Sequence, residues 1–178
     1  REERLLELLD EYRCNGKKQY DCIIPVSGAK DSYFIVHKVK NIYKLNPLLV
    51  SFNHQYNTKL GIRNLEKLRT EFDCDLMTMT IDPNLAKKLV RETLQKLGSI
   101  YWYIHAGSKT FPVQIAARFG IPLIIWGAHQ GLDQVGMFSH LDEVKMTRKY
   151  RKEHDLMGVD AEDLIDISFN LSVNEMRR

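Results

Sequence analysis

Residues 22–32 read CIIPVSGAKDS, and they join a short apolar segment to a small polar turn. The apolar part, residues 22–26, predicts a buried strand, because short apolar runs bounded by turn residues are typical of strands covered on both faces. Pro25 predicts that the ladder of hydrogen bonds finishes there, since proline has no N–H to donate. A helix is expected to follow the turn, with these side chains facing inward: Phe34, Ile35, Val39 and Ile42.

The same alternation of apolar and helical segments repeats along the chain. Further strands are predicted at residues 48–52, 75–81 and 122–126, and further helices at residues 1–13, 58–72, 82–97 and 108–119. The helix at 58–72 is expected to place Leu60, Leu65 and Leu68 on one face. Asp82-Pro83 is typical of a helix start, and Gly98 of a helix end. Alternation of this kind predicts an α/β fold, a Rossmann-like parallel sheet with helices on both faces.

Length and composition predict a single globular domain over residues 1–178. Hydrophobic residues make up 44% of the chain and charged residues 28%, and a core of this size needs no disulfide or metal to support it. The formal charge of +3 argues against a nucleic-acid partner. The apolar stretch at 121–126 is too short for insertion into a membrane, and three cysteines without a C-x-x-C pair indicate a cytoplasmic setting. Because no Met begins the chain, we expect it to be the core fragment of a longer one.

The turn at residues 27–32 is the strongest candidate for a binding site. In parallel sheets ligands bind beyond the carboxyl ends of the strands, which is where this turn lies. The N–H groups of a helix start, the helix dipole and the Lys30 ammonium make a site suited to phosphate, to which Ser27 and Ser32 add hydroxyl donors. Asp31 can cap the helix or hold a metal ion on the phosphates. The alternative is an ordinary helix start that is capped by Ser or Asp.

This turn resembles the S-G-G-x-D-S loop of the PP-loop ATP pyrophosphatases, which are adenine nucleotide alpha hydrolase-like (HUP-domain) proteins. Ser27, Gly28, Lys30, Asp31 and Ser32 match that pattern, and Ala29 stands where it has glycine. In the family the loop holds the pyrophosphate of ATP while an acceptor oxygen is adenylated. The resemblance therefore implies ATP and Mg²⁺, with catalytic roles for Lys30 and Asp31 and the metal at Asp31. A methyl group at Ala29 is costly if that position needs a positive φ or the close approach of the triphosphate.

The end of the second predicted strand agrees with this resemblance. Ser51, Phe52 and His54 lie where PP-loop enzymes contact the adenosine. Phe52 or His54 could stack on adenine, whereas the alternative is that Phe52 is part of the core.

The sequence after the fourth predicted strand also agrees. Residues 127–134, GAHQGLDQ, resemble the G-H…D-Q stretch of the family. The resemblance implies nucleotide or phosphate contacts for Gly127 and His129, and a catalytic, Mg²⁺-binding role for Asp133. The alternative is that His129 and Asp133 make hydrogen bonds within a loop.

Most of the chain, from about residue 20 to 165, is similar to one branch of these enzymes, the N-acetyl sugar amidotransferases of lipopolysaccharide and O-antigen biosynthesis. The resemblance is carried by residues 23–33, 51–57 and 126–134. It implies an enzyme that adenylates the acetamido oxygen of a nucleotide-linked N-acetyl sugar, with release of pyrophosphate. Ammonia then displaces AMP and leaves an acetamidino sugar. The ammonia is expected from separate glutaminase and cyclase-like subunits.

Two other functions are weighed against this one. A tRNA-modifying PP-loop enzyme would need a catalytic cysteine pair or a basic RNA-binding surface, and Cys74 is more readily interpreted as a buried structural thiol. A non-catalytic domain that holds ATP or AMP is favoured by Ala29 and by the short length of the chain.

Two further stretches are candidates for substrate contacts. The aromatic cluster YWYIH at residues 101–105 could line a sugar pocket or pack a helix against the sheet. Residues 107–110, GSKT, have the wrong order for a phosphate loop, so we expect Ser108 or Thr110 to cap the helix that follows. Lys109 is a candidate for a phosphate contact.

Overall fold

The computed structural model describes residues 2–14, 19–127, 147–148, 151–159 and 161–164. They group into two compact units, Arg1–Met79 with Thr110–Gly127, and Thr80–Lys109 with Ala128–Arg178. The expectation of a single domain stays a prediction. Among the described helices, none has the length and apolar character needed to cross a membrane.

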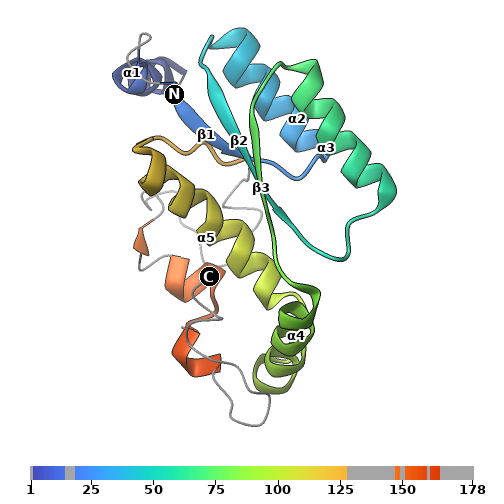
Figure 1. Cartoon of the computed structure of the whole chain (residues 1–178). Helices are drawn as coiled ribbons and strands as arrows, with labels where there is room; N and C mark the ends of the chain where they lie inside the picture. The colour runs from blue at the N-terminus through green and yellow to red at the C-terminus, as the bar shows by residue number, and fades with distance from the viewer. Residues whose placement is uncertain (1, 15–18, 128–146, 149–150, 160, 165–178) are drawn as a thin grey trace. The chain divides into compact units, whose positions relative to one another are not determined.

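The first unit is built on a three-stranded sheet in the order β1-β2-β3 (Figure 1). The strands are β1 Cys22–Pro25, β2 Pro47–Asn53 and β3 Leu76–Thr80, and β1 and β2 are parallel. The predicted fourth strand at 122–126 is shorter than expected. It forms one parallel bridge, Ile23 to Ile124, on the other edge of β1, flanked by hydrogen bonds from Ile23 N to Leu123 O and from Ile125 N to Ile23 O, both 2.9 Å.

Helices cover both faces of this sheet, as the sequence predicts. The pairs Ile24↔Leu49 and Ile23↔Leu48 lie on opposite faces, because side chains alternate along a strand. The face with Ile24 packs against Leu9 of α1 (Glu2–Tyr12), Val36 of α2 (Lys30–Val36) and Leu68 of α3 (Lys59–Glu71). The face with Ile23 packs against Ile115 of α5 (Trp102–Phe119). Figure 1 shows α2 and α3 side by side on one side of the sheet.

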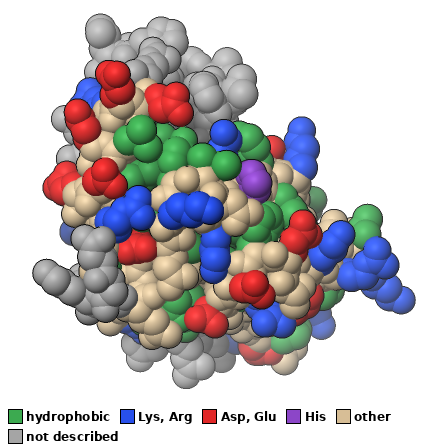
Figure 2. All heavy atoms as spheres, turned by 90° about the horizontal axis from the view of Figure 1, so that it is seen from above, with side chains coloured by type: hydrophobic (Ala, Val, Ile, Leu, Met, Phe, Trp, Pro, Cys, Tyr) green, Lys and Arg blue, Asp and Glu red, His purple; other side chains and the backbone are tan. Residues whose placement is uncertain are grey.

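Two side chains predicted to face inward, Phe34 and Ile42, are instead exposed, and so is Leu60, which was predicted to share one face with Leu65 and Leu68. Phe34 is 62% exposed, Ile42 52% and Leu60 59%, whereas Val39 and Leu68 are buried. The helix α2 passes into a π-helix at His37–Ile42. Because a π-helix closes its hydrogen bonds at i→i+5, the spacing predicted for an α-helix does not hold there, and Ile42 turns outward. Figure 2 shows hydrophobic side chains at the surface among charged ones.

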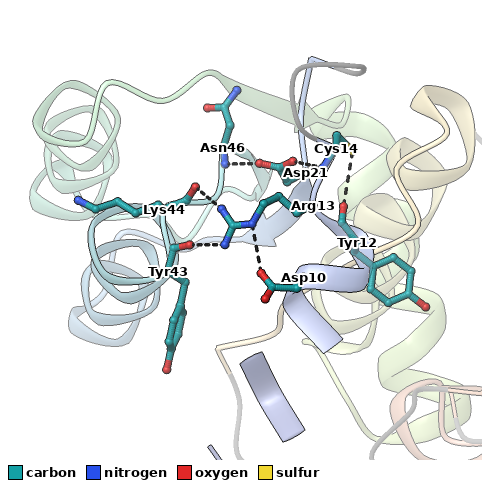
Figure 3. A network of polar contacts seen from close by, with 8 residues as sticks. All are labelled: Asp10, Tyr12, Arg13, Cys14, Asp21, Tyr43, Lys44 and Asn46. Carbon is teal, nitrogen blue, oxygen red and sulfur yellow. Dashed lines mark hydrogen bonds and ion pairs between the residues drawn. The ribbon is translucent and has the colours of Figure 1, made fainter. Parts of the chain in front are cut away.

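Polar contacts hold the end of α1 to the edge of the sheet where the strands begin (Figure 3). The guanidinium of Arg13 donates to the carbonyl oxygens of Tyr43 at 2.9 Å and Lys44 at 3.0 Å, which end the π-helix. The Asp21 carboxylate accepts two backbone N–H groups at 2.7 Å, from Cys14 and Asn46. These bonds join α1, β1, β2 and the π-helix at the edge opposite to the predicted site.

The second unit contains α4 (Pro83–Leu97), whose ends lie where the sequence predicts them. The Asp82 side chain accepts a hydrogen bond from Asn84 N at 3.1 Å, and Gly98 ends the helix with φ of 65°. A left-handed residue of this kind is the usual end of a helix, and glycine adopts it without strain.

The helix α5 begins at Trp102, earlier than predicted. The aromatic cluster therefore forms its first turns, where Trp102 and Tyr103 are buried. Ser108 does not cap the start of a helix. It lies in the middle of α5, and its hydroxyl donates to the carbonyl of His105 at 3.0 Å. Two short segments follow, η2 (Arg151–Asp155) and η3 (Ala161–Leu164), and the Lys109 Nζ lies 3.6 Å from Asp155 Oδ1.

Candidate functional site

The candidate site lies at the edge of the sheet where the strands end. β1 ends at Pro25 as predicted, and Val26 adds one last ladder bond to Val50 O at 2.9 Å. From β1 the chain moves outward to β2 and β3, and it then returns to the other side of β1 at Ile124. The order of strands reverses at β1, and in open α/β sheets such a reversal is where ligands bind.

The loop that follows β1 is closed by a contact between its two serines. The Ser27 N–H donates to Ser32 Oγ at 3.0 Å, and the two hydroxyl oxygens lie 3.4 Å apart. Ser32 is buried and Ser27 is exposed. Ser32 therefore holds the loop in shape from within, while Ser27 is an exposed residue of the same loop.

Gly28 is required in this loop for two independent reasons. Its φ is +77°, a conformation that side chains disfavour. A Cβ atom at this position would lie 2.9 Å from Leu65 N and 3.1 Å from Gly61 O, both in the backbone of α3. The loop is thus pressed against α3 at a point where only glycine fits.

Ala29, the position that departs from the family pattern, needs no such freedom. Its φ is −79° and its ψ 170°, which is extended backbone that any residue adopts. Its side chain is exposed, at the N-cap position of α2. The condition of a positive φ is therefore not met, and the methyl group introduces no backbone strain.

Lys30 and Asp31 occupy the first turn of α2, and both are exposed. The Ser32 N–H donates to Ala29 O at 3.0 Å, while the N–H groups of Lys30 and Asp31 have no acceptor within the helix and carry the positive end of its dipole. In the described part of the chain neither side chain makes a hydrogen bond or an ion pair. The arrangement offers a cation, free N–H groups and one carboxylate at a single point of the surface.

These groups fit a Mg²⁺ ion that is carried by phosphates. Magnesium in nucleotide sites is typically held by one or two carboxylates together with phosphate oxygens and waters. Asp31 provides one such carboxylate, and the described residues contain no group of three or more metal ligands. Asp133, the other predicted ligand, lies outside the described residues, as does His129.

The end of β2 carries the residues predicted to contact the adenosine. Ser51 is buried, and Phe52 and His54 are half-buried. The Tyr56 N–H donates to His54 Nδ1 at 3.2 Å, and burial lowers the pKa of His54 below its ordinary value. His54 is therefore a neutral aromatic ring at pH 7, which is suited to stacking and carries no charge toward a phosphate. The role of all three stays a prediction.

Gly127 lies beside the second turn of α2, the helix that follows the candidate loop. A Cβ atom there would lie 3.6 Å from Cγ2 of Ile35 on α2, which is ordinary contact. The segment at residues 124–127 thus ends beside α2, the helix that follows the candidate loop. The structure brings Gly127 to the second turn of α2, and its contact with a ligand stays a prediction.

The part that α3 plays was missed by the sequence analysis. Besides the contact at Gly28, the Tyr33 hydroxyl donates to the backbone carbonyl of Asn64 at 2.8 Å. A backbone acceptor leaves no signature in the sequence, so no residue pattern could have pointed to this contact.

Two of the cysteines are unsuited to thiol chemistry. Cys22 and Cys74 are buried in the core. Burial raises the pKa of Cys22 to about 12 and raises that of Cys74 as well. Since the thiolate is the reactive form, neither is a nucleophile in the folded chain, and the interpretation of Cys74 as a buried structural thiol is confirmed.

Comparison with known proteins supports the fold. No protein-family model matches the chain. An uncharacterised protein of Methanocaldococcus jannaschii is 34% identical over 83 residues, which are 45% of this chain and 30% of that protein. The NH3-dependent NAD synthetase of Campylobacter jejuni is similar in structure, with a TM-score of 0.58, 16% identity, and coverage of 77% of this chain and 59% of that one. The NMN synthetase of Francisella tularensis has a TM-score of 0.57, 13% identity, and coverage of 97% and 74%.

These likenesses show that the chain has an α/β fold with a parallel sheet and helices, which it shares with these two synthetases, as predicted. At such identities they establish the fold alone. The chain spans less than a third of the curated relative that it matches, and 59% of the NAD synthetase.

Proposed function

We propose that the chain binds ATP with Mg²⁺ at residues 27–32 and forms the adenylating part of an enzyme. The observation that carries this proposal is the loop itself. At Gly28 the loop lies in close contact with the backbone of α3. The loop leads into α2 at the point where the order of the strands reverses. A turn with free N–H groups and an adjacent lysine is an anion site by its construction. The fold shared with two proteins that are named as an NAD synthetase and an NMN synthetase supports the same conclusion.

In this proposal each described residue of the loop has a defined task. The Lys30 ammonium and the N–H groups of the first turn neutralise the phosphates, and the Ser27 hydroxyl donates to them. The carboxylates of Asp31 and Asp133 hold Mg²⁺, which supplies further charge neutralisation on the phosphates. On the nucleoside side, Phe52 or His54 stacks on adenine, with Ser51 beside them.

The acceptor that we propose is the acetamido group of a nucleotide-linked N-acetyl sugar. Its oxygen forms a bond to the α-phosphorus of ATP as the bond to the β-phosphate oxygen breaks, and pyrophosphate leaves. Ammonia then forms a bond to the acetamido carbon, and AMP leaves with the oxygen. The sequence resemblance at residues 23–33, 51–57 and 126–134 supports this choice, and so does the use of ammonia that is stated in the name of the Campylobacter jejuni enzyme. Glutaminase and cyclase-like subunits are the proposed ammonia source in the cytoplasm.

Binding is tested by calorimetry with ATP and AMP in the presence of Mg²⁺. We expect Lys30→Gln to weaken ATP binding about tenfold or more, because it removes a charge-assisted hydrogen bond. Lys67→Gln is the matched control, since it makes the same change at an exposed residue of α3. No binding of either nucleotide by the unaltered chain would overturn the nucleotide assignment.

The reaction is tested on the complete protein that contains this chain. It is incubated with ATP, Mg²⁺, ammonium and a panel of nucleotide-linked N-acetyl sugars, and AMP and the acetamidino product are followed by mass spectrometry. AMP formation that depends on both the sugar and ammonium is the expected result. Binding of ATP with no AMP formed from any sugar would support the domain that holds nucleotide without turnover.

A further inference from the structure

Two contacts connect the start of α2 to one stretch of α3. Gly28 lies against Gly61 and Leu65, and the Tyr33 hydroxyl donates to Asn64 O at 2.8 Å. The Tyr33 ring also packs edge-on against Phe72, with the ring centroids 6.2 Å apart. Burial raises the pKa of Tyr33, so its hydroxyl keeps the proton that it donates at all ordinary pH values. This side chain is therefore fixed at both its ring and its hydroxyl.

The helix α3 is in turn connected closely to the residues that follow β2. The Thr58 hydroxyl accepts a hydrogen bond from Gly61 N at 3.0 Å and so caps the helix. Only a short connection separates Thr58 from His54, and within it Asn57 N donates to His54 O at 3.3 Å. The position of α3 therefore sets the position of the connection at residues 54–58, which carries His54, one of the predicted adenosine contacts.

We propose that Tyr33 is a positioning residue that sets the distance between the phosphate loop and the connection at residues 54–58. Its hydroxyl is occupied by the carbonyl of Asn64, so it acts on a ligand only through the placement of α3 against α2. The inference rests on the proposed function. A ligand that spans both segments, ATP, depends on their spacing. Inorganic pyrophosphate engages the loop alone and does not depend on it.

The experiment compares the unaltered chain with Tyr33→Phe, which keeps the ring on Phe72 and removes only the hydrogen bond. Calorimetry gives the affinities for ATP–Mg²⁺ and for pyrophosphate–Mg²⁺, the latter by competition with ATP where direct binding is weak. From the net worth of one hydrogen bond, we expect ATP affinity to fall about three- to tenfold and pyrophosphate affinity to change by less than about twofold. Tyr43→Phe is the matched control, since that hydroxyl makes no hydrogen bond among the described residues.

A second variant keeps the inference testable if Tyr33→Phe does not fold, which circular dichroism will show. Tyr33→Met also removes the hydroxyl and fills the space with a flexible apolar chain, and the same selective loss is expected. Equal weakening of both ligands in either variant, or no weakening of ATP, would overturn the role of Tyr33. Failure of the unaltered chain to bind either ligand would instead overturn the proposed function.

Discussion

Replacement of Gly28 by alanine tests the geometry on which the site depends. The new Cβ atom meets two obstacles, a backbone φ of +77° and a distance of 2.9 Å to Leu65 N. Left-handed backbone costs an alanine roughly 1–2 kcal/mol, and forcing a methyl group into closely packed backbone costs about 1–3 kcal/mol. Alanine also lowers the conformational entropy of the unfolded chain, and this stabilises the folded state by about 0.4–1 kcal/mol. We therefore expect Gly28→Ala to lower the free energy of unfolding by about 3 kcal/mol, with limits of roughly 1 and 5 kcal/mol.

Two other glycines separate these contributions. Gly120 has a φ of +63° with open space around a Cβ atom, so Gly120→Ala measures the backbone cost without the clash. Gly61 lies within α3, where a Cβ atom would be 3.4 Å from Thr58 Oγ1, and its replacement by alanine gains helix propensity of about 1 kcal/mol. We expect Gly61→Ala to be the most stable of the three variants, Gly120→Ala the next and Gly28→Ala the least stable.

The assay is urea unfolding followed by circular dichroism, with ATP binding measured by calorimetry on each variant that folds. A loss of about 3 kcal/mol from a domain stabilised by roughly 5–15 kcal/mol leaves most molecules folded, so binding can be measured. Gly28→Ala should bind ATP more weakly than the other two variants, because the loop must move away from α3. If Gly28→Ala proved no less stable than Gly120→Ala, the close approach of the loop to α3 would be refuted.

Three further predictions use the same two assays. Ala29→Gly should lower the free energy of unfolding by about 0.4–1 kcal/mol, because it raises only the conformational entropy of the unfolded chain. It should leave the affinity for ATP unchanged. A large gain in affinity would show that the methyl group obstructs the triphosphate. Arg13→Ala should cost about 1–3 kcal/mol, since the carbonyls of Tyr43 and Lys44 lose their donors, and an unchanged urea midpoint would contradict this. Burial lowers the folded-state pKa of His54 below 6.5, so the unfolded chain takes up the proton first, and the free energy of unfolding falls as the pH drops below about 6.5. His54→Gln should make this fall smaller. An unchanged dependence of stability on pH in this variant would exclude His54 as its source.

The elements that the sequence predicted well are those set by local chemistry. Asp82 and Gly98 bound α4 as expected, because a capping carboxylate and a left-handed glycine act within one turn of the helix. The core of β1 and β2 was predicted for a similar reason, since an uninterrupted apolar run has few alternatives to a strand covered on both faces.

The errors arose where tertiary structure outweighs local preference. The helix was predicted to begin at about Ser108, but α5 begins at Trp102. Burial of Trp102 and Tyr103 offsets the cost of roughly 1 kcal/mol for Gly107 inside a helix. Ile42 was misplaced because nothing local signals the change from α- to π-helix at His37. The fourth strand was predicted at full length, although only Ile124 finds a partner.

The candidate site divides in the same way. The loop at residues 27–32 is contiguous, so its motif could be recognised in the sequence and its chemistry inferred from it. The contacts of Gly28 and Tyr33 with α3 join residues about thirty positions apart, and two of their partners are backbone atoms, the Leu65 nitrogen and the Asn64 oxygen. Backbone partners are the same whatever the side chain, so such contacts are found only in the folded structure.

The same geometry changes the meaning of the departure at Ala29. The family pattern has two adjacent glycines, and the structure assigns the need for glycine to the first of them, Gly28, which this chain retains. The second position has extended backbone and an exposed side chain, so any cost of its methyl group must come from the ligand and not from the fold. A methyl group that obstructed the triphosphate would weaken ATP and pyrophosphate alike, because both occupy the loop. Loss at Tyr33 is expected to affect ATP alone, and the two effects can therefore be told apart by the same pair of titrations.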